Sequence, residues 1–206
     1  MKTSFIVKPL PINDIDKDTT IYQQIGDIAL CLFILIADDG ENIYTTKAPM
    51  YILNAIDFSA EELIQSALIT TSWFYPARII DGERLLLNND STPVSITEYK
   101  PSPLNEIIGF ELTNTGYSDG SVTLFYPTTC KRIAEKINDN FYAVPNRFSS
   151  FTIFPKKQFD FEVTTKLLNT SMHKEDFLSS CIFYYDSKKN KLIVCKKEYN
   201  KDAYIF

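Results

Sequence analysis

The sequence has little of the equipment that most enzymes use. It contains one histidine, His173, six glycines and four cysteines among 206 residues. Histidine is the usual acid–base group near neutral pH, so a single histidine with no nucleophile motif beside it disfavours catalysis. The glycines form no GxGxxG, P-loop or GxSxG motif. The sequence therefore points to a protein that binds without turnover and without a cofactor.

Metal-binding spacings are also missing. The cysteines, Cys31, Cys130, Cys181 and Cys195, are scattered and form no CxxC pair, which disfavours zinc and thioredoxin-like chemistry. We expect reduced thiols, with a Cys181–Cys195 cross-strand disulfide as the alternative. Acidic residues alternate over 14–18, but the glycine and the distal glutamate of a calcium loop do not follow. We predict no metal.

Long hydrophobic runs are absent, and we expect no leader. The N-terminal stretch, residues 1–9, is too short in apolar residues to be a signal peptide. The longest apolar run, 28–37, is about half of the roughly 20 residues that a membrane helix needs. These features predict a soluble cytoplasmic protein without a membrane partner.

Positive charge is scarce in the early chain. The net charge is −5. Residues 1–125 carry 7 basic and 17 acidic side chains, a net charge of −10, whereas residues 126–206 carry 14 basic and 9 acidic ones, a net of +5. This balance makes nucleic acid an unlikely partner. The late lysines form either a solvated face or a docking surface for an acidic partner. Six lysines supply most of the late basic excess: Lys188, Lys189, Lys191, Lys196, Lys197 and Lys201.

Strong local patterns are present in the first half. The apolar run 28–37 reads as a central strand buried on both faces, which ends at a turn over 38–40 and pairs with 42–46. A short helix over 50–54 follows. Ser59 and Glu62 form a capping box, which opens a helix that should end near Trp73, before Pro76.

The second half alternates hairpins with single helices. We expect strands over 107–112, 122–126, 141–144, 151–154, 181–185 and 191–195, and helices after Pro127 and over 161–168. Short connections favour antiparallel pairing, so the predicted fold class is α+β with a mostly antiparallel sheet. Prolines and turn signals over 77–105 suggest either two closely packed lobes, 1–100 and 101–206, or a single domain.

Several segments resemble a family of uncharacterised proteins. They are Asp27-Ile28-Ala29, Phe58-Ser59-Ala60-Glu61-Glu62-Leu63, Leu112-Thr113-Asn114, Gly120 to Pro127, Phe141-Tyr142-Ala143-Val144-Pro145, and Phe177 to Asp186. The chain is similar there to a family of unknown function from Gram-positive gut bacteria, often carried on conjugative or phage-like mobile elements. The resemblance implies a fold but no chemistry.

The chain departs from that family at two places. Many members carry a His–Glu pair where this sequence has Ser149 and Ser150, and the capped helix often ends in Asn-Thr where this sequence has Thr70 and Thr71. Any activity that depended on the His–Glu pair would be lost here.

Exposed aromatic and basic residues are the remaining candidates for function. Trp73, Phe74 and Tyr75 form a dense aromatic cluster that contains the sole tryptophan, and Tyr117 lies beside a turn. Core packing at a helix end is the first interpretation of the cluster, and a protein contact is the alternative, because tryptophan and tyrosine are enriched in protein contacts. With Lys188, Lys189 and Lys191, these residues predict a protein-interaction module. The association with mobile elements that the resemblance implies suggests a host defence factor, such as a CRISPR or restriction nuclease, as its partner. The alternative is an enzyme or small-molecule binder that uses a cleft between the lobes. The oligomeric state stays open.

Overall fold

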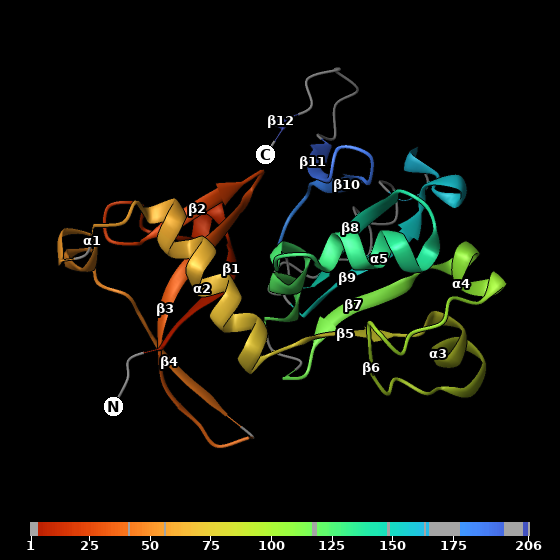
Figure 1. Cartoon of the computed structure of the whole chain (residues 1–206), viewed down its shortest axis with the longest axis horizontal. Helices are drawn as coiled ribbons and strands as arrows, with labels where there is room; N and C mark the ends of the chain where they lie inside the picture. Colours follow the sequence, from red (N-terminus) through yellow and green to blue (C-terminus); the bar gives the residue numbers. More distant parts are fainter. Residues whose placement is uncertain are drawn as a thin grey trace.

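Two antiparallel sheets with helices against them make up the protein (Figure 1). The computed structural model describes residues 4–40, 42–55, 57–116, 119–147, 149–162, 164, 178–195 and 204–205. Each strand pair in this part of the chain is antiparallel. The predicted α+β class with antiparallel pairing is confirmed.

The first sheet is built around one long strand, β3 (Ile28–Asp38). β1 (Ser4–Pro11) pairs along one side of β3. On the other side, β2 (Tyr22–Ile25) pairs with its first half and β4 (Ile43–Lys47) with its second half. The predicted pairing of the apolar run with the segment after the turn is therefore confirmed.

The second sheet has eight strands in the order β12-β11-β10-β8-β9-β7-β5-β6. Their bounds are β5 Ala77–Ile80, β6 Val94–Ser95, β7 Phe110–Asn114, β8 Phe141–Arg147, β9 Ser150–Pro155, β10 Ile182–Asp186, β11 Lys191–Cys195 and β12 Tyr204–Ile205. The β8–β9 and β10–β11 hairpins confirm the predictions for those segments.

Helices cover the sheets and connect them. They are α1 (Tyr51–Ala55), α2 (Ala60–Phe74), α3 (Gly82–Asn88), α4 (Pro103–Ile108) and α5 (Thr129–Ile137), with 3-10 turns η1 (Ile12–Asp14), η2 (Gly120–Phe125) and η3 (Lys156–Gln158). The predicted capping box is present: the Ser59 side chain accepts from the Glu62 N–H, and the Glu62 carboxylate accepts from the Ser59 N–H. The predicted helix over 161–168 lies mostly outside the described residues.

One large apolar core contacts both sheets. It includes Leu30 of β3, Ile64 of α2, Phe151 of β9 and Ile133 of α5, each of them fully buried. The first sheet gives way to the second between the end of α2 and Ala77. The division into lobes at residue 100 stays a prediction, and this shared core joins residues on both sides of it.

The prediction that 28–37 is buried on both faces is right for only the first half of β3. Residues 28–32 are buried, with α2 over one face and a small cluster, Ile12, Ile15, Ala29 and Cys31, on the other. β1 pairs with β3 as far as Leu35, and beyond that point β3 runs on with β4 alone as a two-stranded arm (Figure 1), where Ile36 is 53% exposed. The apolar run is thus longer than the layers that cover it.

The predicted hairpin of 107–112 with 122–126 is wrong. Residues 103–108 form α4, and Gly109, with φ +78°, ends the helix before β7 begins. Residues 120–125 form η2 because β7 already pairs with β5 on one side and β9 on the other. An alternating apolar pattern cannot form a strand when no free edge is left for it.

Candidate functional site

The exposed face of α2 ends in large apolar side chains. Its inner face buries Leu63, Ile64, Ala67, Leu68 and Thr71. Ile69 and Trp73, four residues apart, lie next to each other on the outer face, where residues one helical turn apart are neighbours. Trp73 is 79% exposed, Phe74 46% and Ile69 45%. We call Ile69, Trp73 and Phe74 the aromatic surface.

The aromatic surface is held in place by Tyr75, which is buried. The Tyr75 hydroxyl donates to the Asp38 carboxylate at 2.9 Å, and the Tyr126 hydroxyl donates to the Tyr75 carbonyl oxygen at 3.0 Å. Burial and the neighbouring Asp38 carboxylate raise the pKa of Tyr75. Of the predicted contacts in the cluster at 73–75, Trp73 and Phe74 are exposed, whereas Tyr75 is buried and anchors the end of the helix.

The β3–β4 arm adjoins this end of α2. Asp38, which accepts the Tyr75 hydrogen bond, lies next to Ala37, and Ala37 pairs with Tyr44 on β4. Tyr44 is 51% exposed. The Tyr75–Asp38 hydrogen bond thus connects the aromatic surface to a second exposed aromatic side chain on the arm.

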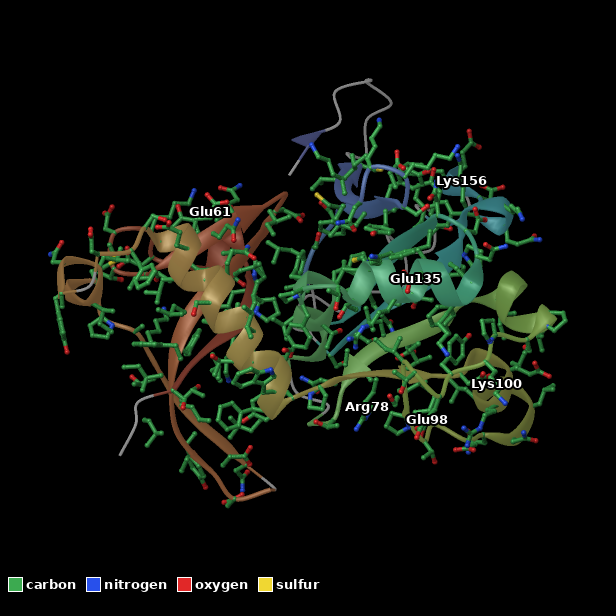
Figure 2. All side chains as sticks on the ribbon, in the orientation of Figure 1. Glu61, Arg78, Glu98, Lys100, Glu135 and Lys156 are labelled. Atoms are coloured by element: carbon green, nitrogen blue, oxygen red, sulfur yellow. The ribbon has the colours of Figure 1, made fainter. Side chains whose placement is uncertain are left out.

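Acidic side chains outnumber basic ones in the early part of the described chain, which includes the aromatic surface. The described residues up to 75 carry three basic side chains, Lys8, Lys17 and Lys47, and nine acidic ones, Asp14, Asp16, Asp18, Asp27, Asp38, Asp39, Asp57, Glu61 and Glu62. Lys8 is itself paired with Asp119 at 3.1 Å. Glu61 lies at the start of α2 (Figure 2). The potential over this part of the protein is therefore negative, which favours a basic partner.

The predicted basic contact lies elsewhere. Lys188, Lys189 and Lys191 are exposed at the β10–β11 turn. Asp186 shapes the turn, because its carboxylate accepts from the backbone N–H groups of Lys188 and Lys189 at 3.0 and 3.2 Å. Figure 1 shows this hairpin well apart from the end of α2. Tyr117, the remaining candidate, lies outside the described residues.

A polar cavity of about 590 Å³ opens between α5 and the β10–β11 turn. Its lining consists of Lys131, Ala134, Glu135, Asn138, Asp139, Asn140, Tyr185, Ser187, Lys188 and Asn190. Glu135 projects from α5 (Figure 2). The cavity involves α5 and the second sheet alone, so it is not the predicted cleft between two lobes. Of the candidates from the sequence, Lys188 is the one that lines it.

Asn140 fixes the shape of this cavity. Its side-chain oxygen accepts from the Ser187 N–H at 2.9 Å and the Ser187 hydroxyl at 2.7 Å, and its amide nitrogen donates to the Tyr184 hydroxyl at 2.7 Å. The Tyr185 hydroxyl donates to Asn190 at 2.6 Å. Sequence reasoning missed Asn140 because its partners lie more than 40 residues away.

A hydrogen-bonded clamp joins the two sheets. One Asp27 carboxylate oxygen accepts from the Ser179 hydroxyl, and the other accepts from the Ser180 N–H at 2.7 Å and the Ser180 hydroxyl at 2.9 Å. Beside it, burial and Asp27 raise the pKa of the Cys181 thiol to about 11. Both segments of the clamp carry motifs of the family resemblance, but sequence alone could not bring them together.

Ser149 and Ser150, where the resemblance places a His–Glu pair, belong to a polar cluster on the second sheet. The Ser150 hydroxyl donates to Glu111 at 3.1 Å, the Asn146 amide donates to Glu111 at 3.1 Å, and the Ser149 carbonyl accepts from Thr113 at 2.8 Å. Ser150 is buried. The Ser150 hydroxyl and the Ser149 carbonyl oxygen therefore both take part in hydrogen bonds within the fold.

Metal-ligating side chains do not gather in the described part of the chain. No three His, Cys, Asp or Glu side chains among the described residues come together as a metal site requires. His173 lies outside the described residues. Cys31, Cys130, Cys181 and Cys195 are free thiols. None of the described helices is long and apolar enough to cross a membrane.

Together, these features define an α+β protein of two antiparallel sheets with an exposed aromatic surface on one capped helix. The chain belongs to a family of unknown function, DUF5688, whose model matches residues 17–187. Searches of curated proteins and of solved structures gave no significant match.

Proposed function

We propose that this protein acts by binding another protein through the aromatic surface, without turning over a substrate. The observation that carries the proposal is Trp73, the one tryptophan of the chain, which is 79% exposed on a helix whose other face is fully packed. Tryptophan is strongly enriched at the energetic centres of protein interfaces. Ile69 and Phe74 add apolar area beside it.

The partner surface should be basic around an apolar centre. The described residues up to 75, which include the aromatic surface, carry nine acidic and three basic side chains. Complementary charge raises the association rate more than the affinity and is screened by salt. The lysine turn at 188–191 offers a second contact of opposite sign, on a separate part of the protein.

A narrower form of the proposal makes the partner a host defence factor, such as a CRISPR or restriction nuclease. Its support is the resemblance to proteins of mobile elements, together with an acidic surface that suits a basic nucleic-acid-binding protein. Cleavage assays with purified nucleases of the host would test it. Inhibition that Trp73→Ala abolishes is the expected result, and unchanged cleavage by every nuclease would end this form of the proposal.

The general proposal needs a purified partner. Affinity capture from the native host with mass spectrometry would identify candidates, and biolayer interferometry with each purified candidate would measure binding. We expect Trp73→Ala to weaken the true complex at least tenfold with an unchanged melting temperature. Leu86→Ala is the matched control, because Leu86 is 65% exposed on α3, outside the aromatic surface. Equal binding by wild type and Trp73→Ala would contradict the proposal.

The competing function is an enzyme. Its clearest test is turnover of a small substrate that depends on Ser150 or His173. Ser150 already lies beside a carboxylate, Glu111. Activity lost in Ser150→Ala and kept in Trp73→Ala would favour catalysis over binding.

A further inference from the structure

The cavity between α5 and the β10–β11 turn carries unpaired charges of both signs. Lys131, Glu135 and Lys188 line it, and none of their side chains has an ion pair or hydrogen bond within the part of the chain that the structure describes. Lys131 and Glu135 lie one helical turn apart on α5 and still do not pair. We infer that this cavity binds a small zwitterionic ligand, such as an amino acid or the end of a short peptide.

The walls of the cavity are already held in a fixed shape. Asn140 ties the turn to the strand β8 through Ser187 and Tyr184, and Asn190 is held by the Tyr185 hydroxyl. Asn138 and Asn190 adopt left-handed backbone conformations, with φ of 50° and 51°. A site whose polar walls are hydrogen-bonded beforehand loses less conformational entropy when a ligand binds.

The charges give the ligand an orientation. The C-terminal end of α5 lies at the cavity, where the helix dipole is negative, and Glu135 adds a carboxylate there. The ammonium group of a zwitterion would lie at this end. The carboxylate of the zwitterion would lie between Lys188 on the turn and Lys131 on α5. Lys131 is one helical turn further than Glu135 from the C-terminal end of α5.

The size suits a small molecule. A cavity of about 590 Å³ lies within the range of about 300–1,000 Å³ that is typical of small-molecule sites. A single amino acid and a short peptide both fit this volume, and they share the same end groups. The experiment must therefore separate the two sources.

Titrations of ¹⁵N-labelled protein by NMR would test the inference, with alanine and alanyl-alanine as probes, each also in N-acetylated and C-amidated form. We expect saturable shifts of the Asn138, Asn140 and Ser187 amide signals with an uncapped probe. Capping either end should weaken binding at least tenfold. Tighter binding of alanine would indicate a free amino acid, and tighter binding of alanyl-alanine a peptide end.

Matched variants complete the test. Glu135→Gln and Lys188→Gln should each weaken binding about tenfold, whereas Lys47→Gln, an exposed lysine of the first sheet, should leave it unchanged. Equal binding of capped and uncapped probes, or no saturable shift at millimolar concentration, would overturn the inference. The result is independent of the aromatic surface, because none of these variants touches Trp73.

Discussion

The carboxylate of Asp27 accepts two hydrogen bonds from Ser180, a residue 153 positions later in the chain, at 2.7 Å from its N–H and 2.9 Å from its hydroxyl. Asp27 lies in the β2–β3 turn of the first sheet, and Ser180 precedes β10 of the second. Ser179 donates to the same carboxylate. This clamp ties the early chain to the late chain by hydrogen bonds as well as by the shared core.

Removal of the clamp should destabilise the whole protein. Asp27→Ala leaves the Ser179 hydroxyl and the Ser180 N–H without their acceptor, which should cost about 1–3 kcal/mol. Urea unfolding would measure the loss. Asp57→Ala, an exposed acid, is the control and should change stability by less than about 0.5 kcal/mol. Equal midpoints for the two variants would show that the clamp contributes nothing.

Trp73 and Leu68 should behave oppositely although both lie on α2. Leu68 is 1% exposed, so Leu68→Ala should cost about 2–5 kcal/mol through the cavity it leaves. Trp73→Ala should change stability by about 0.5 kcal/mol or less, because the indole is mostly in solvent. Thermal and urea unfolding of both variants would check this. A loss of about 3 kcal/mol or more in the free energy of unfolding for Trp73→Ala would refute the exposed placement, because it would match the removal of a core aromatic side chain.

Tolerance to charge should rise along β3. Leu30→Asp should cost about 4 kcal/mol or more, since it buries an unpaired charge at a fully covered position. Ile34→Asp, at a half-buried position, should cost about 1–3 kcal/mol, and Ile36→Asp about 0.5 kcal/mol or less. Denaturation midpoints of the three variants would reveal this order. A similar cost at all three positions would mean that the arm is covered.

Alkaline pH should weaken the fold. Burial raises the pKa of the Cys31 and Cys130 thiols from an ordinary 9.0 to about 12. A raised folded-state pKa means that the associated stability is fully present below pH 9 and is lost as the pH rises toward 12. The contribution of these two thiols to the urea midpoint should thus stay level between pH 7 and 8.5. The midpoint should fall above pH 9. The urea midpoint of Cys130→Ala should fall less steeply with pH than that of the wild type. Identical slopes for the two proteins would contradict thiol ionisation as the cause.

Charge reversal of the lysine turn should spare the fold. Lys188, Lys189 and Lys191 are exposed. The Asp186 carboxylate accepts from the backbone N–H groups of residues 188 and 189, and these groups remain when the side chains are changed to Glu. The triple change to Glu should therefore shift the unfolding free energy by about 1 kcal/mol at most. If the turn contacts an acidic partner, the association rate should fall and lose its salt dependence. An unchanged rate would remove the turn from the interface.

Local signals predicted the parts of the fold that depend on neighbours in sequence. The Ser59 capping box, Pro76 after α2 and the hairpin turn at 187–190 each act within a few residues, and each is found as expected. Pro103 and Gly109 are equally local signals for the start and end of α4. The apolar residues over 107–112 and 122–126 predict a hairpin instead, and α4 and η2 show that this prediction is wrong.

The candidate site was predictable only in part. Trp73 and Phe74 stood out as a dense aromatic cluster, but whether they faced core or solvent depended on which side of α2 packs against β1. Thr71 lies on the packed side, where its hydroxyl accepts from the Val7 N–H at 2.9 Å. No spacing in the sequence relates residue 71 to residue 7.

The sequence by itself determined which segments become strands and helices wherever caps, turns and apolar periodicity act over a few residues, and it determined the charge asymmetry along the chain. Tertiary structure alone decided which strand edges were available, how far β3 is covered, and which polar groups meet. The η2 segment shows the reason, since its pattern favours a strand but both edges of β7 were taken by β5 and β9. Asp27 with Ser180, and α5 with the β10–β11 turn, are likewise brought together only by packing, because the free energy of such contacts depends on distances in space and not in sequence.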